Sequence, residues 1–221
     1  MRRLLELLLP ERCAVCARPG HAVCERCLGA LVRLSPPVCE RCGSPGPWPV
    51  RRCTECSGRR LAFARARSAL VYDERARALV RAWKEHGRRR LAAQAAALVA
   101  EIVARPDVDV LTYVPGDPER ALERGGVAPH GLALALAREW GLPEANLLRR
   151  ARALPRQRGL GLSERRRNVR GSVRAESAVP RSVCLVDDVY TSGATADACA
   201  AALRRAGARR VEVVTLARAV R

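Results

Sequence analysis

A segment near the C-terminus combines the residue types that could bind a phosphorylated sugar. Residues 183–186 are apolar, as in a buried parallel strand, and Asp187 and Asp188 follow them directly. A turn rich in hydroxyl groups comes next, and the alanine-rich residues 196–206 then favour a helix. Backbone N–H groups at the start of a helix bind anions, and such crevices lie beyond the carboxyl ends of parallel strands. We therefore predict a ribose 5-phosphate site, in which the carboxylates accept hydrogen bonds from sugar hydroxyls beside a turn made of Thr191, Ser192, Gly193, Ala194 and Thr195.

Eight of the ten cysteines form four Cys-x-x-Cys pairs within residues 13–56. A single pair could serve redox chemistry or a disulfide scaffold, but four pairs so close together indicate structural zinc. We predict a double zinc ribbon, whose folding energy comes largely from metal ligation. A crossed pairing would also satisfy the spacing, but sequential pairing gives one site with Cys13, Cys16, Cys24 and Cys27 and another with Cys39, Cys42, Cys53 and Cys56.

Several isolated residues leave alternatives open. Acidic pairs at strand ends also bind metals or cap helices, although the order of residue types across 183–195 favours the sugar site. Lys84, the one lysine among 41 basic residues, could contact pyrophosphate oxygens or simply face solvent at a helix end. Trp48 could stack on a nucleobase, but packing beneath the ribbon is favoured. The three histidines lack the spacing of a relay and are interpreted as structural or solvated: His21, His86 and His130.

The elements that must position these residues alternate between strands and helices after residue 60. This order predicts an α/β domain with a mostly parallel sheet over residues 61–221, preceded by a zinc-ribbon module over residues 1–60. The glycine- and arginine-rich residues 154–177 show little periodicity. Strands are predicted at 66–72, 108–114, 146–150, 183–186 and 210–216, and helices at 1–9, 25–34, 74–86, 88–105, 127–140 and 196–206.

The composition bears on partners and on compartment. A formal net charge of +19 favours a polyanion such as nucleic acid, yet 40 of the 41 basic residues are arginine, which is also typical of genome-wide bias. No segment approaches the ~18 uninterrupted apolar residues of a membrane span. Ten cysteines without a targeting signal predict a cytoplasmic protein with reduced thiols.

The segment 183–195 resembles the PRPP-binding signature of type I phosphoribosyltransferases, in which apolar residues precede Asp-Asp and Thr-Ser/Thr-Gly-x-Thr. The resemblance implies that Asp187 and Asp188 contact the ribose hydroxyls and that residues 191–195 hold the 5-phosphate. Nearly the whole chain resembles the ComF family, which joins an N-terminal zinc module to a phosphoribosyltransferase domain. The matching residues outside the signature are Tyr72, Leu79, Trp83, Lys84, Gly87, Val114, Pro115, Gln157 and Arg165 to Asn168.

The family resemblance implies a type I phosphoribosyltransferase fold and PRPP as ligand, with Mg²⁺ entering on the pyrophosphate and two structural Zn²⁺ ions. It also implies that Lys84 and Arg124 contribute to PRPP binding and that Asp187 and Asp188 act in catalysis. The family name implies DNA uptake, with single-stranded DNA and other competence proteins as partners. The family pattern after Arg124 is replaced here by residues 126–130, which lack its aromatic and amide groups. This departure leaves two interpretations open: a phosphoribosyltransferase, or a non-catalytic protein that senses PRPP or a nucleotide and binds single-stranded nucleic acid.

Overall fold

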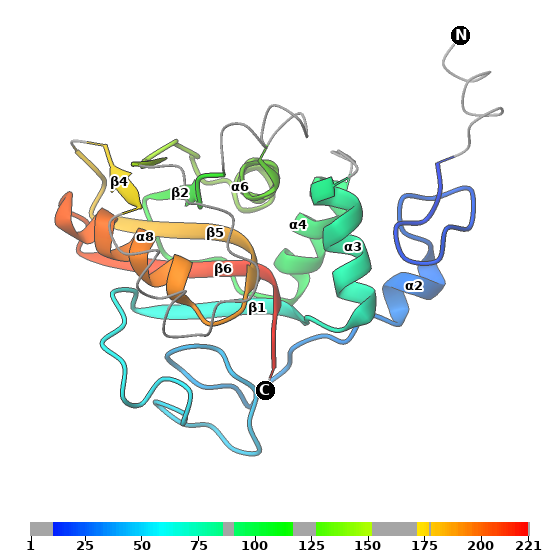
Figure 1. The fold of residues 1–221 in the computed structure, drawn as a ribbon, viewed down its shortest axis with the longest axis horizontal. Coiled ribbons are helices and arrows are strands. Elements are labelled where there is room, and N and C mark those ends of the chain that lie inside the picture. The colour runs from blue at the N-terminus through cyan, green and yellow to red at the C-terminus, as the bar shows by residue number, and fades with distance from the viewer. Residues whose placement is uncertain (1–10, 86–90, 117–126, 152–171, 177, 221) are drawn as a thin grey trace, which may run out of the picture.

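A four-stranded parallel sheet forms the centre of the protein (Figure 1). The computed structural model describes residues 11–85, 91–116, 127–151, 172–176 and 178–220. The strand order is β1-β6-β5-β2, and every neighbouring pair is parallel. The bounds are Arg65–Val71 for β1, Val110–Tyr113 for β2, Ser182–Tyr190 for β5 and Arg210–Arg218 for β6.

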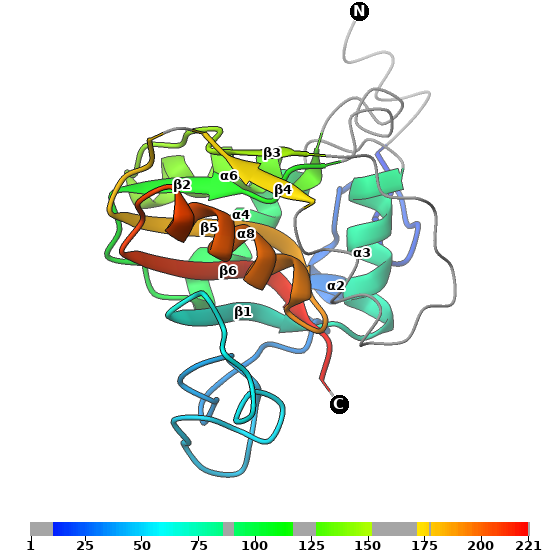
Figure 2. The same ribbon diagram turned by 60° about the vertical axis from the view of Figure 1, so that its left-hand side comes forward.

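The two central strands are mostly buried because helices cover both of their faces. In β6 every residue after Arg210 is buried, as expected for a parallel strand enclosed on two sides. On one face α3, α4 and α6 pack against the sheet, and α8 covers the other face together with the antiparallel pair β3–β4 (Figure 2). The bounds are Glu74–Glu85 for α3, Leu91–Ile102 for α4, Ala128–Trp140 for α6, Leu148–Arg150 for β3, Val173–Ala175 for β4 and Ala194–Arg205 for α8.

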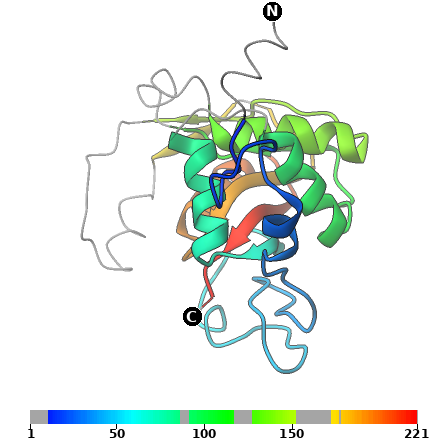
Figure 3. The ribbon, with the colours of Figure 1, turned by 90° about the vertical axis from the view of Figure 1, so that its right-hand side faces the viewer.

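The two cysteine-rich segments pack against different faces of the sheet. Cys13 and Cys27 belong to the same apolar cluster as α3 and α4, whereas Cys39, Cys42 and Cys56 belong to the cluster beneath α8. Figure 3 shows the first segment beside α3 and the second beyond the edge strand β1. The fold is therefore a parallel α/β sheet whose two apolar cores both incorporate part of the N-terminal module.

The chain between the two cysteine segments protects the open edge of the sheet. The N–H of Leu34 donates to the carbonyl of Ala69 at 2.8 Å, and the N–H of Val71 donates to the carbonyl of Val32 at 2.8 Å. An exposed strand edge is a template for aggregation, so pairing residues 32–34 with β1 removes that hazard.

The predicted α/β fold, with its mostly parallel sheet and flanking helices, is confirmed, but several element boundaries differ. Strand β5 does not end at Val186 but continues through Tyr190, and β6 continues to Arg218. The predicted helix at 25–34 is reduced to α2, Glu25–Gly29, since residues 32–34 pair with β1 instead. Strand β4 was not predicted, because it is only three residues long and lies in a glycine- and arginine-rich segment without clear periodicity.

Some predictions are left untested. The predicted helix at 1–9 lies outside the described residues. The division of the chain at residue 60 stays a prediction. None of the helices that the structure describes combines the length and apolar composition that a membrane crossing requires.

Candidate functional site

The acidic pair lies within the last part of β5 rather than after it. Asp187 pairs in register with Thr215 of β6, and the strand continues for three more residues to Tyr190. Because successive side chains of a strand point to opposite faces, the two carboxylates have different surroundings. Asp188 is 3% exposed and forms an ion pair with Lys84 from α3. Asp187 faces the α8 side, and one of its carboxylate oxygens accepts the N–H of Asp188 at 2.9 Å.

Burial changes the acidity of Asp187. The low-polarity surroundings raise its pKa from 3.8 to about 6, although the positive charges of Lys84 and Arg150 act in the opposite direction. Arg150, at the end of β3, also donates from Nε to the carbonyl of Pro115 at 3.1 Å. Arg150 was not predicted as a site residue, because nothing in a chain with 40 arginines distinguishes it from the others.

The hydroxyl turn, residues 191–195, joins β5 directly to α8. Gly193 has φ of 71° and is the N-cap residue of α8. Because glycine has no side chain, the helix has no side-chain capping hydrogen bond at this residue. A Cβ atom at this position would lie 2.2 Å from the hydroxyl oxygen of Tyr190, so both the backbone and the space require glycine. Thr191 is exposed, and Ser192 and Thr195 are partly exposed. The turn therefore presents hydroxyls and the N-terminal end of a helix to solvent, which together suit an anion.

The other residues implicated in sugar phosphate binding have different outcomes. Lys84 is partly exposed and forms an ion pair with the buried carboxylate of Asp188, and its contact with pyrophosphate oxygens stays a prediction. Arg124 lies outside the described residues, as do Gln157 and the segment 165–168. Their predicted roles stay predictions.

The eight paired cysteines form two compact groups in the sequential arrangement. We call these the first cysteine centre (Cys13, Cys16, Cys24 and Cys27) and the second cysteine centre (Cys39, Cys42, Cys53 and Cys56), and within each all four sulfur atoms lie within 4.8 Å of one another. In the second centre, Sγ–Sγ separations are 3.7 Å for Cys39–Cys56 and 3.5 Å for Cys42–Cys53. Four thiolates bound tetrahedrally at about 2.3 Å from zinc lie about 3.8 Å apart, so both groups fit a structural zinc ion.

Backbone donors favour a thiolate at one cysteine of each centre, Cys13 and Cys39, whereas burial raises the pKa of Cys27, Cys42 and Cys56. The N–H of Cys24 donates to the sulfur of Cys13 at 3.4 Å, and the N–H of Cys53 donates to the sulfur of Cys39 at 3.3 Å. Burial raises the pKa of Cys13, but N–H donors from Cys24, Cys16 and Val15 outweigh it and lower the pKa to about 6. Such N–H donors orient metal ligands and stabilise their charged form. When bound, zinc would fix the four thiolates of each centre and thereby the chain segments that carry them.

Trp48 and His130 have surroundings that the sequence did not predict. The interpretation of Trp48 as packed beneath the ribbon is wrong, because 66% of its surface is exposed. His130 stacks on Tyr113 with ring centroids 4.4 Å apart, and its Nε2 atom lies 3.9 Å from a carboxylate oxygen of Glu144.

Comparisons with known proteins place this geometry in context. Residues 4–57 match the family described as double zinc ribbon domain. The DNA utilization protein YhgH of Salmonella typhi is 31% identical over 225 residues, which cover 96% of this chain and 99% of that protein. The YhgH protein of Escherichia coli (strain K12) is 29% identical, with the same coverage.

Solved structures give more partial matches. An allosteric regulatory enzyme of purine biosynthesis matches with a TM-score of 0.39 and 25% identity, over 56% of this chain and 25% of that one. The glutamine PRPP amidotransferase of B. subtilis, complexed with ADP and GMP, matches with a TM-score of 0.38 and 24% identity, over 58% and 26%. The full-length identity to YhgH is the finding that assigns the family. This chain therefore belongs to the ComF family of YhgH-type proteins, in which a double zinc ribbon precedes a phosphoribosyltransferase domain.

Proposed function

We propose that this protein binds PRPP at the carboxyl end of β5, as a phosphoribosyltransferase-type protein that acts in DNA utilisation. The observation that carries the proposal is the direct succession of acidic pair, hydroxyl turn and helix. Gly193, with its positive φ, begins α8 immediately after the turn, so the anion-binding end of the helix lies within a few residues of Asp187. A ligand that joins a phosphate to a sugar with neighbouring hydroxyls fits both parts at once.

Each part of the site would have a separate role. The hydroxyl turn would hold the 5-phosphate, and Asp187, which is partly exposed, would accept ribose hydroxyls. Asp188 is buried against Lys84 and would hold that lysine beside the sugar site. Mg²⁺ would enter mainly with the pyrophosphate, because this ion takes few protein ligands and favours phosphate oxygens. Binding and charge arrangement would then supply most of any catalysis at C1 of the ribose.

Isothermal titration calorimetry with PRPP and Mg²⁺ tests the proposal. We expect saturable binding to the wild type and loss of detectable binding in the double variant Asp187→Asn/Asp188→Asn. The variant Glu139→Gln, which removes an exposed carboxylate from α6, serves as a charge control. Equal binding to wild type and double variant, or none to the wild type, would refute the PRPP site.

Turnover is a separate question from binding. Pyrophosphate release from PRPP, screened across nucleobases and other amine acceptors, would identify a phosphoribosyltransferase. Binding without release across all acceptors would identify the sensor alternative, which the atypical residues 126–130 favour.

Single-stranded DNA is the second proposed ligand, and the protein would meet it in the cytoplasm together with other competence proteins. Three observations support it: the name of the YhgH relatives as DNA utilization proteins, the net charge of +19, and the exposure of Trp48. An exposed indole ring suits stacking on an unpaired base, which contributes about 1–3 kcal/mol per base.

Fluorescence anisotropy with a labelled oligonucleotide tests this part. We expect affinity to fall linearly in log–log coordinates with salt, and Trp48→Ala to weaken binding by about tenfold at one salt concentration. Leu134→Ala, an exposed apolar position on α6, is the matched control and should leave binding unchanged. If Trp48→Ala binds the oligonucleotide as tightly as Leu134→Ala, Trp48 does not contact the DNA.

A further inference from the structure

Arg218, the last residue of β6, connects the second cysteine centre to the sugar site. Its side chain is 0% exposed, and its Nη1 atom donates to the carbonyl of Cys42 at 2.7 Å. Its Nη2 atom donates to a carboxylate oxygen of Glu55 at 2.6 Å, so the buried charge is paired. The guanidinium carbon also lies 4.6 Å from the ring centroid of Tyr190. One arginine therefore contacts both the cysteine segment and the last residue of β5.

Tyr190 lies beneath the hydroxyl turn. It is 3% exposed, and the guanidinium of Arg218 lies over the face of its ring. The ring of Phe63 makes an edge-to-face contact with it, with ring centroids 6.4 Å apart. Its hydroxyl group occupies the space where a side chain on Gly193 would be. Any shift of Arg218 that moves this ring would therefore move the floor of the turn.

A second set of contacts reaches the turn from the chain that follows Cys56. The N–H of Arg59 donates to the carbonyl of Cys56 at 3.1 Å, and its Nη1 atom donates to the carbonyl of Ser192 at 2.8 Å. Three residues later, the N–H of Ala62 donates to a carboxylate oxygen of Asp197 in α8 at 2.7 Å. These two hydrogen bonds hold the turn from both sides of Gly193.

We infer that the second cysteine centre positions the hydroxyl turn, with Arg59, Arg218 and Tyr190 as the positioning residues. The inference rests on the proposed function, because it makes PRPP affinity depend on this centre. When the four cysteines are held together, the segment 53–62 and the carbonyl of Cys42 have fixed places, and the turn is ordered before the ligand arrives. The first cysteine centre packs in the other apolar cluster, with α3 and α4, so it serves as an internal control.

The test compares Arg59→Ala with Arg60→Ala, which removes the same charge from an exposed neighbouring residue. Calorimetry with PRPP and Mg²⁺ should show affinity about tenfold weaker in Arg59→Ala, and within about twofold of wild type in Arg60→Ala. Zinc content and melting temperature should match in the two variants. Arg59→Lys, which keeps a donor for the carbonyl of Ser192, should recover most of the affinity, a rescue that loss of general stability would not give.

Hydrogen–deuterium exchange at residues 191–196 tests the positioning without PRPP. Exchange should rise in Arg59→Ala and in Cys53→Ser of the second centre, but stay at the wild-type level in Cys16→Ser of the first. If the wild type binds no PRPP while exchange follows this pattern, the proposed function fails and the positioning stands. Equal exchange and equal affinity in Arg59→Ala and Arg60→Ala would overturn the inference, even if Cys53→Ser does not fold.

Discussion

The two carboxylates of the acidic pair have different surroundings, because burial governs the acidity of Asp187 and Asp188 forms an ion pair with Lys84. Burial raises the pKa of Asp187 to about 6, so the folded protein retains a proton that the unfolded chain releases near 3.8. This contribution to stability is complete below pH 3.8 and is lost as the pH rises through about 6. Above that pH the ionised carboxylate can accept sugar hydroxyls. We expect PRPP affinity to fall by about tenfold between pH 7 and pH 5, measured by calorimetry.

The phosphates of PRPP also titrate in this range, so the control is the same titration with Asp187→Asn. That variant binds PRPP more weakly at neutral pH but should show a shallower pH dependence. Parallel pH profiles for the wild type and Asp187→Asn would show that this carboxylate does not control binding.

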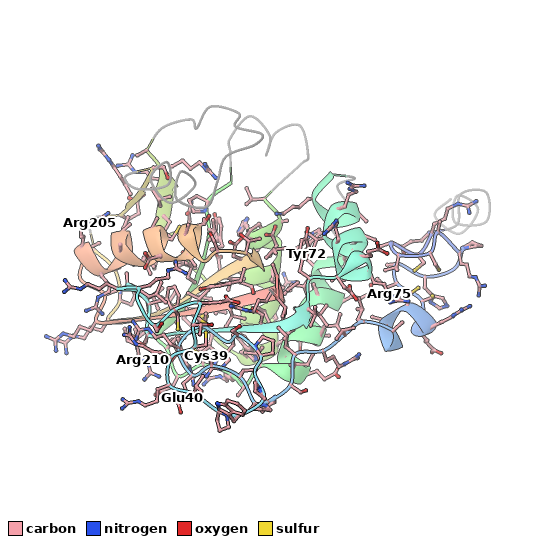
Figure 4. The ribbon with its side chains drawn as sticks, turned by 60° about the horizontal axis from the view of Figure 1, so that its bottom comes forward. Cys39, Glu40, Tyr72, Arg75, Arg205 and Arg210 are labelled. Carbon is pink, nitrogen blue, oxygen red and sulfur yellow. The ribbon has the colours of Figure 1, made fainter. Side chains whose placement is uncertain are left out.

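Lys84 provides a second prediction at this scale. The carboxylate of Asp188 is almost fully buried and Lys84 is partly exposed, so Lys84→Gln leaves a buried charge without its cation. After allowance for solvent screening of the lysine, we expect a loss of about 1–3 kcal/mol in the free energy of unfolding, measured by urea denaturation. Adding Asp188→Asn should restore part of that loss. Arg75→Gln, at an exposed position of α3 labelled in Figure 4, should cost much less.

Residue identities at the site were predictable where the chain is contiguous and unpredictable where it is not. The acidic pair and the hydroxyl turn lie next to one another in sequence, so their types alone indicated an anion site. Arg150, Arg59 and Arg218 reach the site from distant segments, and only the fold brings them there. The one available signal for Arg218 was its position directly after the apolar residues at the end of β6.

The junction between β5 and α8 depends on a conformation that only glycine adopts easily. Gly193→Ala combines φ of 71° with a Cβ atom 2.2 Å from the hydroxyl of Tyr190, so the turn must move. We expect a loss of about 1–3 kcal/mol in stability and loss of PRPP binding, measured by urea denaturation and calorimetry. Gly207→Ala, which has φ of 111° and open space at its Cβ position, is the control. It should lower stability while leaving PRPP binding intact, and loss of binding in both variants would contradict a local role for Gly193.

The order and type of the elements were predictable from periodicity, but the length of β5 was not. Polar residues such as Asp187 and Asp188 ordinarily end a strand, yet β6 continues to pair with β5 as far as Tyr190 and Arg218. Tertiary pairing therefore overrode the local polarity. The same effect explains why the helix predicted at 25–34 is shorter, because residues 32–34 form backbone hydrogen bonds with the edge strand β1.

At the scale of the molecule, the cysteine centres are parts of both cores rather than an attached module. Cys13 and Cys27 are buried with the helices on one face, and Cys39, Cys42 and Cys56 are buried with α8 on the other. Gly43 approaches β1 so closely that a Cβ atom would lie 2.6 Å from the carbonyl oxygen of Ala66. In Figure 4 Cys39 and Glu40 are seen in the segment beneath the sheet, and Arg67 of β1 donates to the carbonyl of Glu40 at 3.0 Å. The ribbons and the sheet therefore share one set of contacts.

This sharing predicts how the protein unfolds without metal. Zinc analysis of the purified protein should give two ions per chain, because two centres each supply four sulfurs. Removal with a chelator should then lower the melting temperature of the whole chain in one transition, since metal ligation supplies folding energy to segments that belong to both cores. Circular dichroism at a helix wavelength and tryptophan fluorescence should follow the same curve. If the two signals separated, with the helical transition at its original temperature, the α/β part would fold independently of the zinc ribbons. The contacts of Arg218 and Gly43 would then contribute nothing measurable to the stability of the α/β part.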